Sequence, residues 1–191
     1  MILVLPRSVC TALVTLSLVP WDAAFSPALT WRARDLVETD PDWLQVIPYA
    51  VLIDLADRPW AYRRTGGDDR LRARCSIGVG GHVEQEDDRG DLLPTVRAAL
   101  ARELAEELAA YPRTMAGLIQ PIAWINEQKT AIGRVHLGLV FALPWGMADP
   151  PQPRRGEGLE AIGFVDPTAI TSAAGYEDWS LLARDAVRGR S

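Results

Sequence analysis

The chain has 191 residues, of which 48% are hydrophobic and 24% are charged, as expected for a globular domain with a sizeable apolar core. The formal net charge of −5 argues against binding to a nucleic acid polymer, because no basic excess is present to neutralise a phosphate backbone. The sequence contains only two cysteines, Cys10 and Cys75, which excludes a disulfide framework; Cys75 is predicted to be buried in a strand.

Residues 1–44 are interpreted as an N-terminal extension that packs on a main domain of residues 45–191. The apolar run at 2–5 favours a strand, and residues 8–19 favour a packed helix or turn. A secretory signal core is the alternative for residues 8–19, but a single positive side chain, Arg7, precedes them. The run is also too short to span a bilayer, so we expect a cytoplasmic protein without membrane attachment.

The first part of the main domain is rich in predicted strands. Residues 48–54 and 60–64 are apolar runs separated by Ala-Asp-Arg-Pro at 56–59, a pattern that predicts a hairpin. Residues 65–69 contain two glycines and two aspartates and predict a turn. A short strand is then expected at 75–79.

The second part begins with an acidic loop at 84–91 and a helix that runs to about residue 110. Pro94 fits the first turn of this helix, where its missing N–H does not disrupt hydrogen bonding. The later elements are strands at 118–126 and 135–143 with a turn at 127–130, a loop at 149–155, a strand at 158–165, a short helix from 167 and a terminal helix at 177–188. Strands on both sides of a central helix imply an α+β fold with a mixed sheet packed between helices.

The central helix carries three glutamates at metal-ligand spacing. Glu103, Glu106 and Glu107 lie within an arc of roughly 100° on one helix face. Hard cations such as Mg²⁺ take carboxylate oxygens as ligands. The apolar stripe beside this arc favours a partly buried metal site over a solvated acidic face, and it consists of Val96, Leu100, Leu104 and Leu108.

The sequence from Arg102 to Glu107 resembles the core of the Nudix box, the signature of the Nudix hydrolases. In that family the helix glutamates bind Mg²⁺ or Mn²⁺, and water cleaves a diphosphate linked to another moiety. The resemblance implies an α/β/α sandwich with a mixed sheet. It also implies that Glu103, Glu106 and Glu107 are the metal ligands and catalytic residues, and that Arg102 orients them.

Gly80 and Gly81 resemble the glycines that open the Nudix box. The Gly80 carbonyl is a candidate extra ligand. A glycine pair also lets the backbone approach a ligand closely. His82 follows the pair, and we expect it either to contact a phosphate or to hydrogen-bond a loop carbonyl.

The match to the box departs from the family pattern at three places. The gap between the glycines and Arg102 is lengthened, the upstream glutamate of the box falls on Pro94, and the usual glycine after the paired glutamates is Ala109. The acids that could replace the missing glutamate are Glu84, Glu86, Asp87, Asp88 and Asp91. Further similarity at 47–49, 76–82, 133–138 and 163–165 resembles a Nudix subgroup with this lengthened Gly-Gly-His loop.

These observations favour a metal-dependent hydrolase that cleaves a diphosphate linkage in a nucleoside diphosphate derivative or a related organic pyrophosphate. Its partner would be a small-molecule phosphate substrate, and a homodimer is left open. The general base belongs either to the box or to a more distant acid, namely Glu127, Glu157 or Glu160. The alternatives are a catalytically silent Nudix-fold module that binds a nucleotide-like ligand for regulation, and an unrelated protein with a fortuitous acidic helix.

Overall fold

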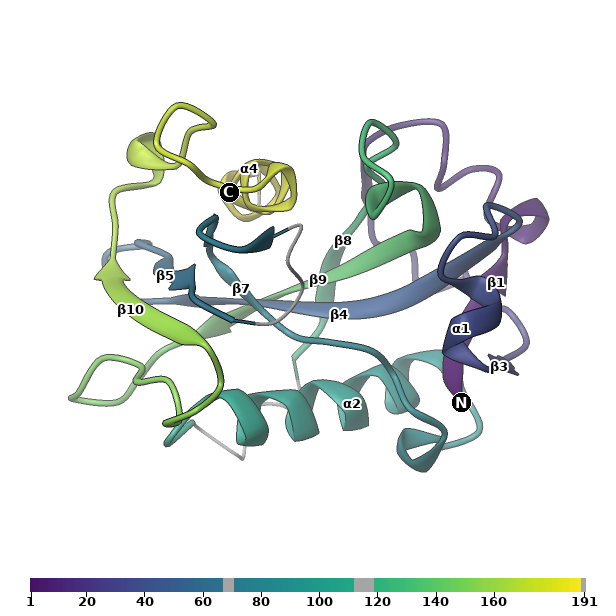
Figure 1. Ribbon diagram of the computed structural model, residues 1–191, viewed down its shortest axis with the longest axis horizontal. Helices are drawn as coiled ribbons and strands as arrows, with labels where there is room; N and C mark the ends of the chain where they lie inside the picture. The colour runs from purple at the N-terminus through teal and green to yellow at the C-terminus, as the bar shows by residue number, and fades with distance from the viewer. Residues whose placement is uncertain (67–70, 112–118, 190–191) are drawn as a thin grey trace.

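A computed structural model describes residues 1–66, 71–111 and 119–189 (Figure 1). The main sheet has the strand order β2-β8-β9-β4-β1-β3, and β7 pairs with β4 beside this path. Its strands are β1 (Ile2–Pro6), β2 (Leu18–Pro20), β3 (Thr30–Arg32), β4 (Trp43–Ile53), β7 (Gly78–Val79), β8 (Pro121–Ile125) and β9 (His136–Pro144). Because β4 and β9 are parallel and the other recorded pairs are antiparallel, this sheet is mixed.

A smaller sheet has the order β10-β5-β6 and consists of β5 (Trp60–Arg64), β6 (Cys75–Ser76) and β10 (Leu159–Phe164). The α-helices are α1 (Arg34–Val37), α2 (Leu92–Glu107) and α4 (Asp178–Arg188). Short 3-10 helices are η1 (Arg7–Val9), η3 (Gln85–Asp87), η4 (Gly133–Val135) and η5 (Pro167–Ala169). In Figure 1, α2 and α4 lie on opposite sides of β4 and β9, which confirms the predicted α+β sandwich with a mixed sheet.

Strand β4 is buried on both faces. Successive side chains of a strand point to opposite sides, so each face of β4 packs against a different group of residues. Residues Leu44, Val46, Ala50 and Leu52 belong to the same apolar cluster as Val96, Leu100 and Leu104 of α2. Residues Tyr49, Val51 and Ile53 belong instead to a cluster that contains Ala183 of α4. The alternation in β4 therefore separates an α2 side of the sheet from an α4 side.

The N-terminal residues take part in the main sheet. Strand β1 lies between β4 and β3, which confirms the strand expected at 2–5. The Leu3 N–H donates to the Val83 carbonyl over 2.8 Å, and the Gln85 N–H donates to the Met1 carbonyl over 3.0 Å. Residues 18–20, placed by the sequence at the end of a helix or turn and just beyond it, form strand β2 against β8. Strand β1 thus supports the segment that follows the glycine pair.

The predicted hairpin between 48–54 and 60–64 is wrong in its pairing. The turn is present, because the Asp54 carboxylate accepts from the Ala56 and Arg58 N–H groups over 2.9 Å each. However, the bridge that closes this turn joins Ile53 to Pro59, just before β5, and β5 itself pairs with β10 and β6. A local pattern predicts strands and turns, but β5 lies at the centre of the smaller sheet and one of its partners, β10, is distant in sequence.

Other boundaries differ for physical reasons that the structure shows. The single strand expected at 75–79 is split, because β6 pairs with β5 while β7 pairs with β4. Helix α2 stops at Glu107, three residues before the expected end, since Leu108 is extended and forms a bridge with Pro153. Residue 118 and part of the turn at 65–69 lie outside the described residues.

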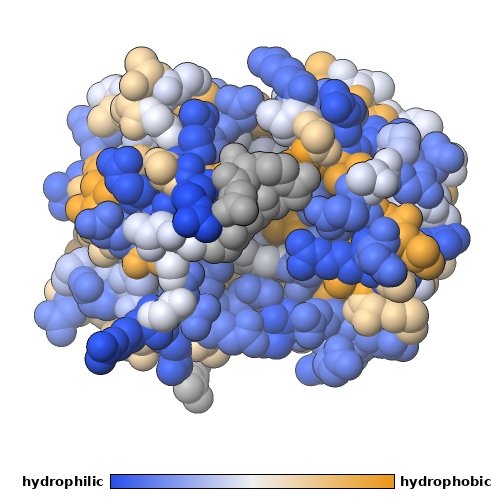
Figure 2. All heavy atoms as spheres, in the orientation of Figure 1, coloured by the Kyte–Doolittle hydropathy of each residue, from blue (hydrophilic) through white to orange (hydrophobic). Residues whose placement is uncertain are grey.

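The face of the molecule seen in Figure 2 is mostly hydrophilic, with smaller hydrophobic areas between charged side chains. Among the helices of the described residues, none is both long and apolar enough to cross a membrane.

Candidate active site

Arg102 on α2 connects the glutamates of the helix with the loop that precedes it. Its Nη1 donates to Glu103 Oε1 over 2.8 Å and to Glu106 Oε2 over 3.2 Å. Its Nη2 donates to the His82 carbonyl over 2.8 Å and to Asp87 Oδ2 over 2.9 Å. These contacts connect Glu103 and Glu106 with the Gly-Gly-His segment, and the orienting role of Arg102 stays a prediction.

Among the five acids considered as replacements for the missing box glutamate, Asp87 is the one that contacts Arg102. Its carboxylate also accepts from the Glu84 N–H over 2.9 Å, which caps the short helix η3. Asp87 is 5% exposed. A carboxylate buried to this extent is costly unless it is paired, and Arg102 supplies the pairing charge.

The glycine pair is explained by two close approaches of the backbone. A Cβ on Gly80 would lie 1.8 Å from the Pro48 carbonyl oxygen of β4. A Cβ on Gly81 would lie 2.6 Å from the carboxylate atoms of Glu103. Any side chain at these positions would push the segment away from β4 or from the glutamate, so the pair allows the backbone to lie directly against the Glu103 carboxylate.

Glu107 is the most perturbed of the three helix glutamates. Its Oε2 is buried and has no hydrogen-bond partner. Burial raises the pKa of Glu107 to about 7; Arg64 opposes this rise, and the charges of Glu103, Glu157 and Glu106 add to it. Burial also raises the pKa of Glu103, against the effect of Arg102. A buried acceptor atom without a partner, next to other carboxylates, is a position that a cation would stabilise.

We call Glu103, Glu106 and Glu107 the carboxylate face. Within the described part of the chain, no group of three or more His, Cys, Asp and Glu side chains is gathered so as to hold a metal ion. For Glu103 and Glu106, one oxygen of each carboxylate is occupied by Arg102, because Arg102 Nη1 contacts both side chains. Each of these carboxylates keeps a second oxygen, and the Glu106 side chain is 53% exposed and can turn. The donor set, all carboxylate oxygen, suits a hard cation.

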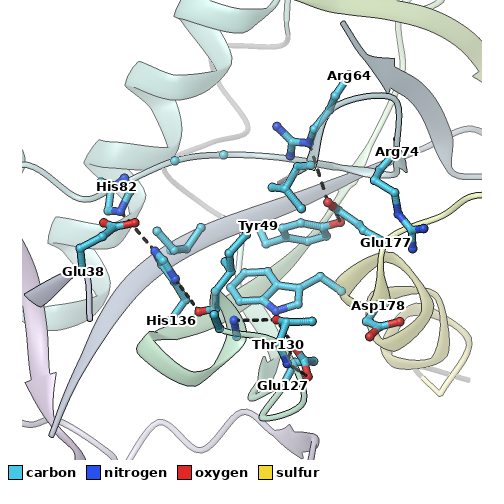
Figure 3. A pocket seen from close by; sticks show the side chains of 18 of the residues that line it. Glu38, Tyr49, Arg64, Arg74, His82, Glu127, Thr130, His136, Glu177 and Asp178 are labelled. Carbon is cyan, nitrogen blue, oxygen red and sulfur yellow. Dashed lines mark hydrogen bonds and ion pairs between the residues drawn. The ribbon is translucent and has the colours of Figure 1, made fainter. Parts of the chain in front are cut away.

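A cavity of about 540 Å³ lies on the α4 side of the sheet, and its wall does not include Glu103, Glu106 or Glu107. Gly80, Gly81 and His82 form part of its wall, so the backbone at Gly81 separates the cavity from Glu103. Figure 3 shows two groups of polar side chains in this cavity, one around His82 and His136 and the other around Arg64 and Glu177.

At the histidine end of the cavity, the His82 imidazole is neutral. The Gln45 amide is oriented by its donation to the Val37 carbonyl over 3.3 Å, so its Oε1 accepts from His82 Nε2 over 2.8 Å. Burial, together with the nearby charges of Arg34 and His136, lowers the pKa of His82 to about 3. Arg34 and Glu38, both from the N-terminal 44 residues, also line this end.

The other end rests on a buried network that we call the Tyr49 network: Tyr49, Ser76, Glu177 and Ser180. The Tyr49 hydroxyl lies 3.1 Å from Glu177 Oε1, to which it donates, 3.2 Å from Ser76 Oγ and 3.1 Å from Ser180 Oγ. The Ser76 hydroxyl donates to the same Glu177 oxygen over 2.6 Å. Trp179 packs edge-on against the Tyr49 ring at a centroid distance of 5.6 Å. The network fixes the Glu177 carboxylate at the cavity wall.

The three candidate bases lie in different surroundings. Glu127 lines the cavity, but its carboxylate accepts from the N–H groups of Lys129 and Thr130 and from the Thr130 hydroxyl. Glu157 is close enough to raise the pKa of Glu107 through its charge. Glu160 is exposed on β10. The identity of the base remains a prediction.

Sequence analysis did not identify Tyr49, Arg64 and Glu177 as residues of the site. They come from β4, β5 and the residue before α4, and 128 positions separate Tyr49 from Glu177. The available signal was a tyrosine and a serine, Tyr49 and Ser76, within the apolar strands expected at 48–54 and 75–79. Buried polar side chains of this kind need partners.

No family model matches the sequence. The chain is 32% identical over 112 residues to protein YmaB of Bacillus subtilis (strain 168), a match that covers 58% of this chain and about half, 53%, of YmaB. The crystal structure of Tm1382, a protein assigned provisionally as a Nudix hydrolase, is similar to this chain with a TM-score of 0.76 at 22% identity. The match covers 98% of this chain and 98% of that one.

A second solved structure extends the similarity to a protein with bound ligands. It is a bifunctional NMN adenylyltransferase/ADP ribose pyrophosphatase from Francisella tularensis, complexed with AMP and a Mn ion. The TM-score is 0.56 at 12% identity, over 76% of this chain and 41% of that one. At these identities the similarity concerns the fold. The sandwich around β4 and β9 and the agreement with Tm1382 over nearly the whole length show that this chain has the Nudix fold.

Proposed function

We propose that this chain is a metal-dependent hydrolase that cleaves a diphosphate linkage in a nucleoside diphosphate derivative or a related organic pyrophosphate. The observation that carries the proposal is the buried, unpartnered Oε2 of Glu107 on the same helix face as Glu103 and Glu106. The charges of Glu103 and Glu106 raise the pKa of Glu107, and a divalent cation bound among the three carboxylates would relieve this repulsion. The Mn ion and the AMP in the Francisella structure support the same classes of metal and ligand.

In this proposal Glu103, Glu106 and Glu107 bind Mg²⁺ or Mn²⁺. A bound divalent ion would polarise a phosphoryl oxygen and lower the pKa of a coordinated water molecule. Arg102 holds the glutamates in register with the glycine pair, and Asp87 holds Arg102. Gly80 and Gly81 leave the backbone accessible on the cavity side, where the diphosphate would lie.

The cavity is the proposed substrate site. Its volume of about 540 Å³ is in the range of small-molecule pockets, roughly 300–1,000 Å³. A neutral His82 can exchange a hydrogen bond with the substrate. The Glu127 carboxylate already accepts hydrogen bonds from Thr130 in its own loop, whereas the charge of Glu157 is close enough to raise the pKa of Glu107. We therefore favour Glu157 as the general base.

We also propose that the chain belongs to the Nudix subgroup with a lengthened Gly-Gly-His loop. Helix η3 lies in the added length and brings Asp87 to Arg102. The acid that the standard box places at the position of Pro94 is thus supplied from within the longer loop.

The test is hydrolysis of a panel of nucleotide sugars, dinucleotides and modified triphosphates, with Mg²⁺, with Mn²⁺ and with chelator. Release of a monophosphate should require the metal and should fall by at least about 100-fold in Glu107→Gln, since losing one charged ligand weakens both metal binding and charge stabilisation. Glu86→Gln is the matched control, because Glu86 is an exposed acid of the preceding loop. Equal activity in chelator and in Mg²⁺ would rule out the proposed mechanism.

A second candidate function is a silent module that binds a nucleotide-like ligand for regulation. The contact of Arg102 Nη1 with both Glu103 and Glu106 favours it, because in this arrangement the helix acids neutralise an arginine. Thermal stabilisation by nucleotides such as ADP-ribose without turnover of any compound in the panel would support this candidate over the hydrolase.

A further inference from the structure

Arg64, the last residue of β5, is a cavity-lining arginine with unused hydrogen-bonding capacity. Its side chain is 20% exposed, and its Nε is buried without a hydrogen-bond partner. In the described part of the chain, its recorded polar contact is with Glu177, where Nε lies 3.7 Å from Oε2. That distance allows charge attraction but exceeds a hydrogen bond.

Glu177 does not satisfy the guanidinium, because it is held elsewhere. Its Oε1 accepts from the hydroxyls of Tyr49 and Ser76. The Tyr62 ring, 5.5 Å from the guanidinium carbon, adds a weak cation–π contact. Arg74, the neighbouring arginine in the cavity wall, differs because its Nη2 donates to the Tyr176 carbonyl over 2.8 Å. The buried Nε of Arg64 therefore lacks a hydrogen-bond acceptor, whereas Arg74 has one for its Nη2.

The position of Arg64 relates the cavity to the carboxylate face. Its positive charge acts on Glu177 on one side and on Glu107 of α2 on the other. In Figure 3, Arg64 and Glu177 face each other at the edge of the Tyr49 ring. A guanidinium offers five N–H donors in a planar fork that matches two oxygens of a phosphate.

We propose that Arg64 binds a phosphate oxygen of the substrate inside the cavity, next to the phosphate that the carboxylate face addresses through its metal. This inference rests on the proposed function, and it assigns Arg64 to one of the two phosphates of the proposed diphosphate substrate. The Tyr49 network sets the position of the arginine by fixing Glu177. Because the charges of Glu177 and Glu107 act on Arg64, a divalent cation should strengthen binding of the anion.

The experiment measures binding of methylenebisphosphonate, a diphosphate that cannot be hydrolysed at its bridge, by calorimetry with and without Mg²⁺. Arg64→Met removes the charge at similar length, and Arg64→Lys keeps the charge but loses the planar fork. Arg63→Met is the matched control, because Arg63 is exposed on the same strand and does not line the cavity. Binding of Mn²⁺ alone is measured for each variant.

We expect affinity for the bisphosphonate in Mg²⁺ to fall about 10- to 100-fold in Arg64→Met, the range for a charge-assisted hydrogen bond, and less in Arg64→Lys. Mn²⁺ binding should be retained, and Arg63→Met should bind like the unmodified chain. If Arg64→Met is unfolded, Arg64→Lys still tests the fork, and a bisphosphonate affinity unchanged from the unmodified chain would then overturn the inference.

Two further outcomes separate this inference from the proposed function. Normal Mn²⁺ binding with bisphosphonate affinity unchanged in Arg64→Met would refute the role of Arg64 and leave the metal site standing. Bisphosphonate binding that needs Arg64 but no metal, in a chain that binds no Mn²⁺, would support Arg64 and refute the hydrolase. Absence of bisphosphonate binding to the unmodified chain, with or without Mg²⁺, would overturn the inference.

Discussion

The carboxylate face on α2 and the Tyr49 network under the cavity are two polar clusters built on opposite principles. The carboxylate face contains a buried oxygen without a partner and lies next to charges of its own sign. The Tyr49 network has its hydroxyls and one carboxylate oxygen hydrogen-bonded to one another. The first cluster is incomplete in the protein alone, whereas the second is satisfied, and this difference separates a site for a ligand from the support that holds it.

The largest effect is expected where a change removes the space that the Tyr49 network needs. A Cβ on Gly78 would lie 2.0 Å from the Tyr49 ring. Gly78→Ala should therefore lower the free energy of unfolding by about 3 kcal/mol, at the upper end for an overpacked core. Chemical denaturation measures the change, and Gly146→Ala is the control because its Cβ would enter open space. An effect equal to that of Gly146→Ala would contradict the packing at Tyr49.

Removing the charge of Glu107 should raise the free energy of unfolding, whereas Gly78→Ala lowers it. The pKa of Glu107 is raised to about 7 in the folded chain, so the native state holds this proton more tightly than the unfolded state. The protonated Glu107 therefore contributes to the free energy of unfolding fully below about pH 4.5, and this contribution is lost as the pH rises through about 7. In chelator at pH 8, Glu107→Gln should therefore be more stable than the unmodified chain by on the order of 2 kcal/mol.

The pH profile of the denaturation midpoint checks this prediction. The unmodified chain should lose stability between pH 5 and 7 more steeply than Glu107→Gln, and Mg²⁺ should recover part of the loss at pH 8. Parallel profiles for the two proteins would show that Glu107 does not carry an unfavourable buried charge.

The same chemical change in the Tyr49 network sharpens the contrast. Glu177→Gln removes the charge beside Arg64 and places an amide N–H₂ among hydroxyls and a guanidinium that are already donors. We expect a loss of about 1–2 kcal/mol in unfolding free energy, since a buried polar group is left poorly paired. Denaturation of Glu177→Gln and Glu107→Gln at pH 8 compares the two directly, and a stabilising effect of both would remove the distinction between the clusters.

The two clusters also differ in how far the sequence predicts them. Glu103, Glu106 and Glu107 were identified because helical spacing is local, and a stretch of five residues suffices to place them on one face. Asp87, which pairs with Arg102, was one of five candidates, because the choice depends on how η3 folds the lengthened loop. Local periodicity predicts the face but not the loop that approaches it.

The Tyr49 network is built from residues that no local pattern connects. Ser76 and Glu177 are 101 positions apart, and they meet because the segment after β5 crosses from the smaller sheet to the main one. The wrong hairpin between β4 and β5 has the same origin, since β5 finds its partners in β6 and β10. The fold class was predictable from the order of elements, while strand pairing, and with it the cavity, depended on long-range packing.

The smallest effect tests the support of the carboxylate face. Asp87→Asn keeps the cap on η3, in which the Glu84 N–H donates to the side chain, but removes the negative charge paired with Arg102. Arg102 would then attract Glu103 and Glu106 more strongly, so Mn²⁺ should bind about tenfold more weakly, as when an outer-shell partner of a metal ligand is lost. Calorimetric titration with Mn²⁺ measures this, with Asp91→Asn as the control because Asp91 is an exposed residue before α2 whose side chain makes no capping hydrogen bond. Equal affinities of the two variants would mean that the charge of Asp87 does not contribute to the position of Arg102, and that its contacts with the helix acids and the His82 carbonyl suffice.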